Sequence, residues 1–122
     1  MANKILIVED NPMNRRLIGD ILKYYGYEIL EAENGEEGIR MAKEQITDLI
    51  IMDLQMPIRN GYDAIRILKN DPETKHIKII AITSFAMAGD REKALETGAD
   101  DYISKPINTR ELPKVVERLL GV

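Results

Sequence analysis

Cysteine and tryptophan are absent from this chain, and only one phenylalanine and one histidine occur among its 122 residues. Without cysteine, the chain can form neither disulfides nor a thiolate metal site. No apolar run approaches the roughly 18 residues that a membrane-spanning helix needs. The N-terminus opens with Lys4 and a short apolar segment, which does not resemble a signal peptide. We therefore expect a cytoplasmic protein with no membrane partner.

The chain also lacks Pro/Ser-rich stretches, long charge runs and low-complexity segments. Its net charge is −4, from 17 basic and 21 acidic residues. Nucleic acid is therefore a disfavoured partner, because proteins bind phosphate backbones through basic patches. A chain of this length suits one hydrophobic core. We expect a single domain over residues 1–122.

Short apolar runs alternate with segments of helical periodicity five times. The pattern predicts strands over 5–8, 27–32, 48–52, 77–82 and 101–104. It predicts helices over 12–25, from the loop at Asn34-Gly35 to about residue 44, over 61–68 and 86–97, and from an N-cap at Asn108 to residue 120. Such alternation indicates an α/β fold, with a parallel sheet covered by helices on both faces. The short single series favours the flavodoxin-like strand order 2-1-3-4-5.

Two helices carry finer expectations. The periodicity of the first predicts one buried face, formed by Met13, Leu17, Ile18, Ile21, Leu22 and Tyr25. In the last helix, Asn108 is expected to form a capping box with Glu111. Pro113 lies inside that helix, where it removes one hydrogen bond and can bend the first turns.

Polar residues stand where the predicted strands end. They are Glu9 and Asp10 after the first strand, Asp53 after the third, Thr83 after the fourth and Lys105 after the fifth. Parallel strands bring these ends to one edge, and ligands of open α/β sheets bind at the switch point there. Three carboxylates, a hydroxyl and an ammonium are therefore expected in one pocket.

The chemistry of this set points to phosphoryl transfer. Clustered carboxylates call for a divalent cation, and Mg²⁺ fits because it prefers oxygen ligands and needs only one or two carboxylates plus phosphate. The Lys105 ammonium calls for an anionic ligand, and a carboxylate such as Asp53 can act as a nucleophile toward phosphorus.

Each residue also has a purely structural explanation. Glu9 and Asp10 could be an acid pair at a helix N-terminus, Asp53 and Thr83 could serve turns, and Lys105 could lie on the surface. Five such residues at matching strand ends favour the shared pocket. The histidine, His76, precedes the fourth strand and is expected on the surface, far from the pocket.

Four segments carry a resemblance that spans essentially the whole chain. They are residues 5–11 (ILIVEDN), 51–57 (IMDLQMP) with Gly61, 82–84 (ITS) and 102–106 (YISKP). With them, the chain resembles a response-regulator receiver domain of two-component signalling, which has a CheY-like fold. Residues 84–90 (SFAMAGD) are similar to stand-alone receivers of the DivK type and to receivers of hybrid sensor kinases.

The resemblance implies a role for each residue of the pocket. Asp53 would be the phosphoacceptor, with Thr83 and Lys105 holding the phosphoryl group. Mg²⁺ would be bound by the Asp10 and Asp53 carboxylates and the Gln55 backbone carbonyl, with Glu9 supporting it through water. Tyr102 would be the aromatic switch residue that turns inward with Thr83. The remaining candidates, at the rim of the site, are Ser84 and Phe85, and Phe85 could equally be buried.

The implied function is a single-domain response regulator. A histidine kinase or histidine phosphotransfer protein would phosphorylate Asp53 in a Mg²⁺-dependent reaction. The downstream target would bind the face formed by the fourth and fifth strands with the helices that follow them, and a phosphorylation-dependent dimer is a further expectation. The chain could instead be a receiver excised from a hybrid sensor kinase, but its start at Met1 and its end after the last helix favour a stand-alone protein.

Three other functions fit these residues less well. An enzyme that hydrolyses external phosphate esters usually carries an acid two residues after its nucleophile, where this chain has Gln55, so we expect no turnover of external substrates beyond self-phosphorylation and slow dephosphorylation. A flavin carrier needs a loop rich in Ser, Thr or Gly after the first strand, where residues 9–12 read EDNP. A module that binds partners without phosphorylation would not need the full five-residue set.

Overall fold

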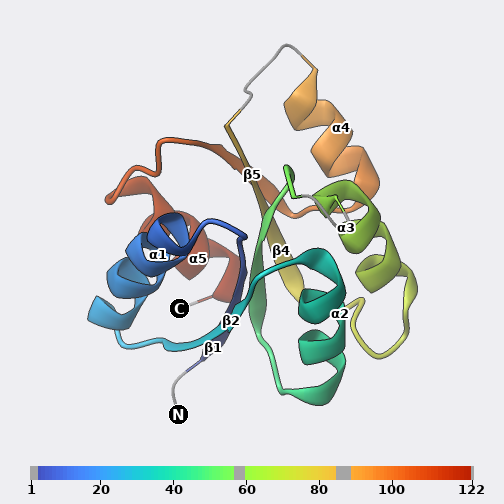
Figure 1. The fold of residues 1–122 in the computed structure, drawn as a ribbon, viewed down its shortest axis with the longest axis horizontal. Helices are drawn as coiled ribbons and strands as arrows, with labels where there is room; N and C mark the ends of the chain where they lie inside the picture. The colour runs from blue at the N-terminus through green and yellow to red at the C-terminus, as the bar shows by residue number, and fades with distance from the viewer. Residues whose placement is uncertain (1–2, 57–59, 85–88, 122) are drawn as a thin grey trace.

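The computed structural model describes residues 3–56, 60–84 and 89–121, and the ribbon in Figure 1 follows them along the chain. Strands and helices alternate five times, as predicted. They are β1 (Lys4–Val8), α1 (Pro12–Tyr24), β2 (Glu28–Ala32), α2 (Gly35–Glu44), β3 (Leu49–Asp53), α3 (Gly61–Asn70), β4 (Lys78–Thr83), α4 (Asp90–Thr97), β5 (Asp101–Ser104) and α5 (Glu111–Leu120).

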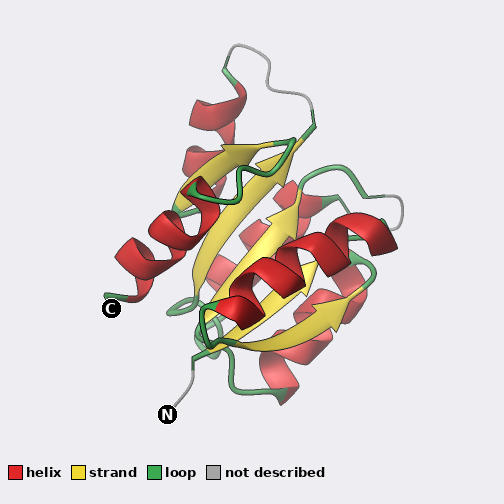
Figure 2. Cartoon of the chain, turned by 90° about the vertical axis from the view of Figure 1, so that its left-hand side faces the viewer, coloured by secondary structure: helices red, strands yellow, loops and turns green. Residues whose placement is uncertain are grey.

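The five strands form one sheet in the order β2-β1-β3-β4-β5, and every neighbouring pair is parallel. Helices cover both faces of the sheet (Figure 2). The predicted fold class and strand order are therefore confirmed. Within the described residues, no helix is long and apolar enough to cross a membrane.

Alternate residues of the central strands supply two separate cores. Leu6, Val8 and Ile50 face the core beneath α2, α3 and α4, while Ile5 and Ile7 face the core beneath α1 and α5. Figure 1 shows α1 and α5 together on one side of the sheet and α2 and α3 on the other. Because both faces are buried, the central strands read as continuous apolar runs rather than as an alternating pattern.

The buried face predicted for the first helix is wrong in part. Ile18 and Leu22 are fully buried, but the side chains of Met13, Leu17 and Tyr25 are 81%, 42% and 49% exposed. The line through Ile18 and Leu22 is the one that faces the sheet. Residues on the neighbouring line of the helix do not contact the sheet. Their apolar side chains therefore remain exposed to water, although the periodicity counts them as part of the buried face.

Two helix starts also differ from the prediction. The fourth helix was expected from residue 86, but α4 begins at Asp90 after Gly89, whose φ of 89° lies in the left-handed region that glycine adopts readily. Residues 86–88 lie outside the described part. The last helix begins at Glu111, later than Asn108 suggests, although the Asn108 side chain accepts the N–H groups of Arg110 and Glu111 at 2.8 and 3.0 Å.

Pro113 is better accommodated than its position in the pattern suggests. It is the third residue of α5, and its side chain is buried. The N–H groups of a helix's first turn have no partner within the helix, so a proline there sacrifices no helical hydrogen bond.

Candidate functional site

The register of the sheet brings the polar strand ends to one edge. Val8 is level with Met52, Asp53 with Ile82, and Thr83 with Ser104. The residues that end or follow these strands therefore lie side by side, at the edge toward which the strand arrows in Figure 2 point. These are the predicted residues Glu9, Asp10, Asp53, Thr83 and Lys105.

An ammonium and two buried carboxylates form the centre of the site. The Lys105 Nζ lies 3.3 Å from Asp53 Oδ2 and 3.1 Å from Glu9 Oε2. Glu9 is 0% exposed and Asp53 is 2% exposed. The Lys105 backbone N–H donates to the Thr83 carbonyl at 2.7 Å, which ties the end of β5 to that of β4. The predicted contact between Lys105 and Asp53 is thus present.

Their surroundings perturb the titration of Asp53 and Lys105. Desolvation raises the pKa of Asp53 to about 7, and the Glu9 carboxylate adds to this, while the Gln55 N–H and the Lys105 ammonium oppose it. Burial lowers the pKa of Lys105, but its hydrogen bond to Glu9 and the charge of Asp53 outweigh that effect and leave the pKa raised. Burial thus favours the neutral form of Asp53, while Lys105 holds its proton more firmly than a free lysine does.

The three acids fit a hard divalent cation. Glu9, Asp10 and Asp53 each place one carboxylate oxygen within 4.8 Å of the others. Among the described residues, Glu9 Oε2 is buried and has no hydrogen-bond partner, its 3.1 Å contact with Lys105 being an ion pair without hydrogen-bond geometry. Asp10 is exposed, so the cluster opens to solvent. A set of oxygen donors with one open side is what Mg²⁺ prefers.

Gln55 and Ser84 border the acceptor. The Gln55 N–H donates to Asp53 Oδ1 at 3.0 Å, and the Gln55 side-chain oxygen accepts the Ser84 N–H at 3.1 Å. Thr83 is buried at the end of β4. Ser84, one of the two predicted rim residues, is exposed beside it. The other predicted rim residue, Phe85, lies outside the described residues.

Comparison with known proteins agrees with this geometry. The family model for the response regulator receiver domain matches residues 5–117. The chain belongs to this family. It is 40% identical over 121 residues to the polar-differentiation response regulator DivK of Brucella anthropi, which covers 99% of this chain and 98% of that protein. The predicted resemblance is confirmed, and the chain is a receiver domain of two-component signalling.

Two solved receiver structures illustrate the likeness. The receiver domain of the sensor histidine kinase PA1611 from Pseudomonas aeruginosa, with a magnesium ion coordinated in its active-site cleft, has a TM-score of 0.91, 36% identity and full coverage of both chains. The receiver domain of Ssk1 from Saccharomyces cerevisiae, crystallised with the histidine phosphotransfer protein Ypd1, has a TM-score of 0.89 and 30% identity over 98% of this chain and 90% of that one.

Tyr102 of this receiver domain lies half-buried on β5 and packs against the core beneath α2, α3 and α4. Its hydroxyl is buried and has no hydrogen-bond partner among the described residues. Burial accordingly raises its pKa, with a further contribution from Asp90. Its role as a switch residue stays a prediction; in the sheet it lies level with Ala81 of β4.

Sequence reasoning missed two contacts that support the site. The Arg15 guanidinium donates to the Glu9 carbonyl at 2.7 Å and pairs with Glu31 at 3.1 Å. Gly61 belongs to the family motif, but its physical role emerges only here: a Cβ at this position would lie 2.3 Å from the Asp53 carbonyl oxygen. Both contacts depend on how a helix meets the sheet, and no local pattern signals them.

His76 is not part of the site. It is exposed in the loop before β4, at the end of the sheet opposite to Asp53. The surface position expected for it is therefore confirmed.

Proposed function

We propose that Asp53 of this receiver domain accepts a phosphoryl group from the phosphohistidine of a histidine kinase or histidine phosphotransfer protein. One observation carries the proposal: Asp53 is a buried acid whose Oδ2 faces the Lys105 ammonium while its Oδ1 accepts the Gln55 N–H. In the yeast complex, a receiver domain binds a phosphotransfer protein, which supports the same class of partner here.

The transfer exchanges one bond to phosphorus for another. A carboxylate oxygen of Asp53 attacks the phosphorus, a P–O bond forms, and the P–N bond to the donor imidazole breaks. The imidazole nitrogen takes up a proton, so the products are an aspartyl phosphate and a neutral imidazole. Such reactions depend mainly on positioning and charge neutralisation. Lys105 neutralises charge on the phosphoryl oxygens, and the Thr83 hydroxyl donates a hydrogen bond to them.

The metal ligands we propose are Asp10, Asp53 and the Gln55 backbone carbonyl, with Glu9 acting through water. Bound Mg²⁺ would supply neutralisation of the charge that the phosphoryl oxygens carry. The magnesium ion in the related Pseudomonas receiver domain supports this choice of metal. The same residues allow the domain to promote its own phosphorylation by small acyl phosphates and a slow hydrolysis of the product.

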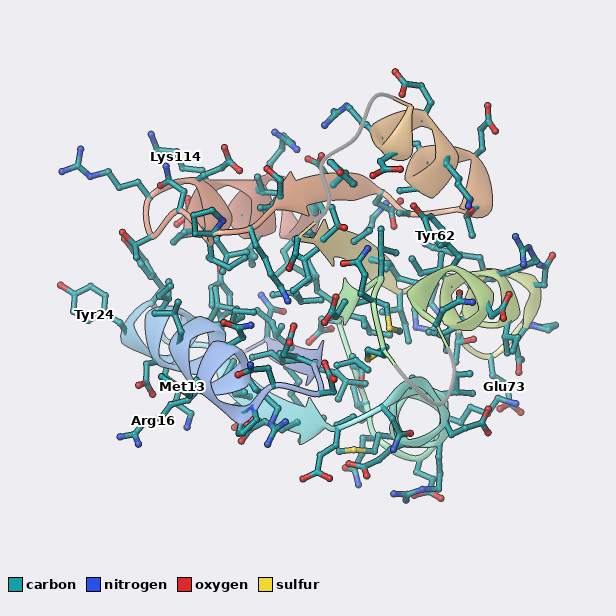
Figure 3. The ribbon with its side chains drawn as sticks, turned by 45° about the horizontal axis from the view of Figure 1, so that its top comes forward. Met13, Arg16, Tyr24, Tyr62, Glu73 and Lys114 are labelled. Carbon is teal, nitrogen blue, oxygen red and sulfur yellow. The ribbon has the colours of Figure 1, made fainter. Side chains whose placement is uncertain are left out.

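The outer surface of α1 is where we propose that the donor docks. This helix begins at Pro12, directly after the acidic pair of the pocket. Its side chains Met13, Leu17 and Tyr24 are 81%, 42% and 85% exposed, and Tyr24 projects away from the body of the molecule in Figure 3. Exposed apolar side chains that gather on one element are typical of protein interfaces.

The output surface we propose is the face of β4, α4, β5 and α5. Asp101 on β5 connects its elements, because its carboxylate pairs with Arg118 of α5 and lies 3.7 Å from Arg91 of α4. Phosphorylation adds a charge of about −1.5 to −2. Drawing Thr83 and Lys105 toward that charge would shift the population of this face between two states and turn Tyr102 inward. A downstream protein, or a second copy of the chain, would read the change.

Labelling of Asp53 tests the whole proposal. Incubation with acetyl phosphate and Mg²⁺ is expected to add one phosphoryl group by intact mass, and Asp53→Asn is expected to abolish it. Asp63→Asn, which alters an exposed acid on α3, is the matched control and should be labelled like the unmodified chain. Persistent labelling of the Asp53→Asn variant would overturn the assignment.

A further inference from the structure

The Gln55 side chain has no part in the chemistry above, yet it forms a specific contact. Its backbone N–H binds the acceptor Asp53 at 3.0 Å, and its side-chain oxygen accepts the Ser84 N–H at 3.1 Å. One residue thus contacts both the phosphoacceptor and the first residue after Thr83, whose hydroxyl is proposed to bind the phosphoryl group. The proposed metal contact uses the Gln55 backbone carbonyl, so the side-chain carboxamide is not a metal ligand and remains available for the contact with Ser84.

Backbone contacts fix the end of β4 up to Thr83. The Leu54 N–H donates to the Ile82 carbonyl at 2.9 Å, and the Lys105 N–H donates to the Thr83 carbonyl at 2.7 Å. Ser84 follows as the first residue beyond the strand, and it is exposed. Its N–H meets a side chain rather than a neighbouring strand, so the position of the loop at this point depends on the identity of residue 55.

The hydrogen bond to Gln55 is of a kind that phosphorylation can displace. It joins two neutral groups at an exposed position, and such bonds contribute little net stability. A phosphoryl group on Asp53 brings charged acceptor oxygens, whose hydrogen bonds are roughly twice as strong as neutral ones. If these oxygens draw in Thr83 with its backbone, the adjoining Ser84 moves relative to Gln55.

We propose that the Gln55 carboxamide is a positioning residue, which holds the loop at Ser84 in its resting place and so limits how readily the domain takes up a phosphoryl group. This inference rests on the proposed function of Asp53. A ligand shifts a two-state equilibrium according to its preference for one state. Loss of one neutral hydrogen bond that favours the resting state is therefore expected to strengthen phosphoryl binding about two- to tenfold.

The test replaces Gln55 by methionine, which keeps the length of the side chain and removes the acceptor. Fluoroberyllate, a non-hydrolysable mimic of the aspartyl phosphoryl group, is titrated in the presence of Mg²⁺. Its dissociation constant is expected to fall about two- to tenfold, while the affinity for Mg²⁺ alone stays unchanged because the backbone carbonyl remains. Gln45→Met, at the exposed C-cap of α2, is the matched control and should behave like the unmodified chain.

Amide hydrogen exchange provides a readout that does not depend on phosphoryl binding. The Ser84 amide is expected to be protected in the unmodified domain and to exchange faster in Gln55→Met. Exchange at the unprotected rate in the unmodified domain would overturn the inference without any variant. Gln55→Ala repeats the test if the methionine variant fails to fold.

The outcomes separate the two proposals. Fluoroberyllate binding that is unchanged or weaker in folded Gln55→Met refutes the positioning role and leaves Asp53 as the acceptor. Failure of the unmodified domain to bind fluoroberyllate, or to be labelled on Asp53, overturns the proposed function and this inference with it.

Discussion

The Lys105 ammonium lies 3.3 Å from the Asp53 carboxylate, although 52 positions separate the two residues in the chain. The Glu9 carboxylate lies against the same ammonium at 3.1 Å. One cation therefore serves two buried acids, and the stability of the pocket depends on which of these groups are charged. This balance leads to the first two predictions.

Asp53→Asn is expected to stabilise the metal-free domain at high pH. The folded state raises the pKa of Asp53 from 3.8 to about 7, so it binds this proton more tightly than the unfolded chain does. The resulting stabilisation is complete below about pH 4 and is lost as the pH rises to 7. Above pH 7, the ionised group costs about 1–3 kcal/mol, after allowance for screening where the pocket opens to solvent.

Thermal melts in EDTA check this sign. The melting temperature of Asp53→Asn should exceed that of the unmodified domain at pH 8, and the difference should shrink toward pH 4. A difference that grows on acidification would mean that Asp53 is ionised and stabilising in the fold, which contradicts the raised pKa.

Lys105→Met should affect metal binding and phosphorylation in opposite directions. Removing the ammonium leaves the carboxylates of Glu9, Asp10 and Asp53 without their cation, so the affinity for Mg²⁺ is expected to increase. Phosphorylation by acetyl phosphate should slow by about tenfold or more, because charge on the phosphoryl oxygens is no longer neutralised. Isothermal titration and labelling rates measure the two effects, and a parallel loss of both would indicate a general collapse of the pocket.

Asp10→Ala should weaken Mg²⁺ binding by at least about tenfold, because even the mutation of a residue that only hydrogen-bonds a metal ligand typically lowers metal affinity by that much. Asp20→Ala, which alters an exposed acid on α1, serves as the control. Unchanged affinity in Asp10→Ala would place the metal elsewhere.

Gly61→Ala and Gly19→Ala are expected to change stability in opposite directions. A Cβ on Gly61 would lie 2.3 Å from the Asp53 carbonyl oxygen and 2.7 Å from the Leu54 Cα, so backbone must move. Such overpacking costs about 1–3 kcal/mol or more. At Gly19, inside α1, the nearest atoms are 3.7 Å away. Alanine there should stabilise the domain by about 0.5–1 kcal/mol, through its higher helix propensity. Urea unfolding of both variants measures the contrast.

Tyr24→Ser combined with Leu17→Ala should slow phosphotransfer from a phosphorylated histidine donor without changing labelling by acetyl phosphate. The small donor needs only the pocket, whereas a protein donor also needs the exposed surface of α1. Ile67→Ala, which removes an apolar side chain that is 36% exposed on α3, is the control. An equal loss of phosphorylation rate with both donors would mean that these side chains support the structure of the pocket and do not form a docking interface.

The fold and the centre of the site were predictable because they depend on strand ends. A short apolar run followed by Asp53 or by Glu9 and Asp10 identifies both a strand and the edge at which it ends, and parallel pairing then brings those ends together. The contact between Lys105 and Asp53 follows from the same rule.

Contacts that depend on side-chain reach or helix orientation could not be predicted. Apolar periodicity counts Met13 as equal to Ile18, but only the docked helix shows that one of them faces water. The hydrogen bond between Gln55 and Ser84 joins two loops whose separation no pattern encodes. The contact between the Lys93 ammonium and the Tyr62 ring, 4.4 Å from the ring centre, could not be predicted either, because α3 and α4 meet only in the folded molecule.

The ion pair between Lys105 and Glu9 spans the sheet from its edge strand to its second strand. Lys105 follows Ser104 of β5, and Glu9 follows β1, with β3 and β4 between them. The ammonium thus belongs to the residue that directly follows the edge strand, which carries Asp101 and Tyr102. One side chain therefore joins a buried acid near the middle of the sheet to the end of its edge strand.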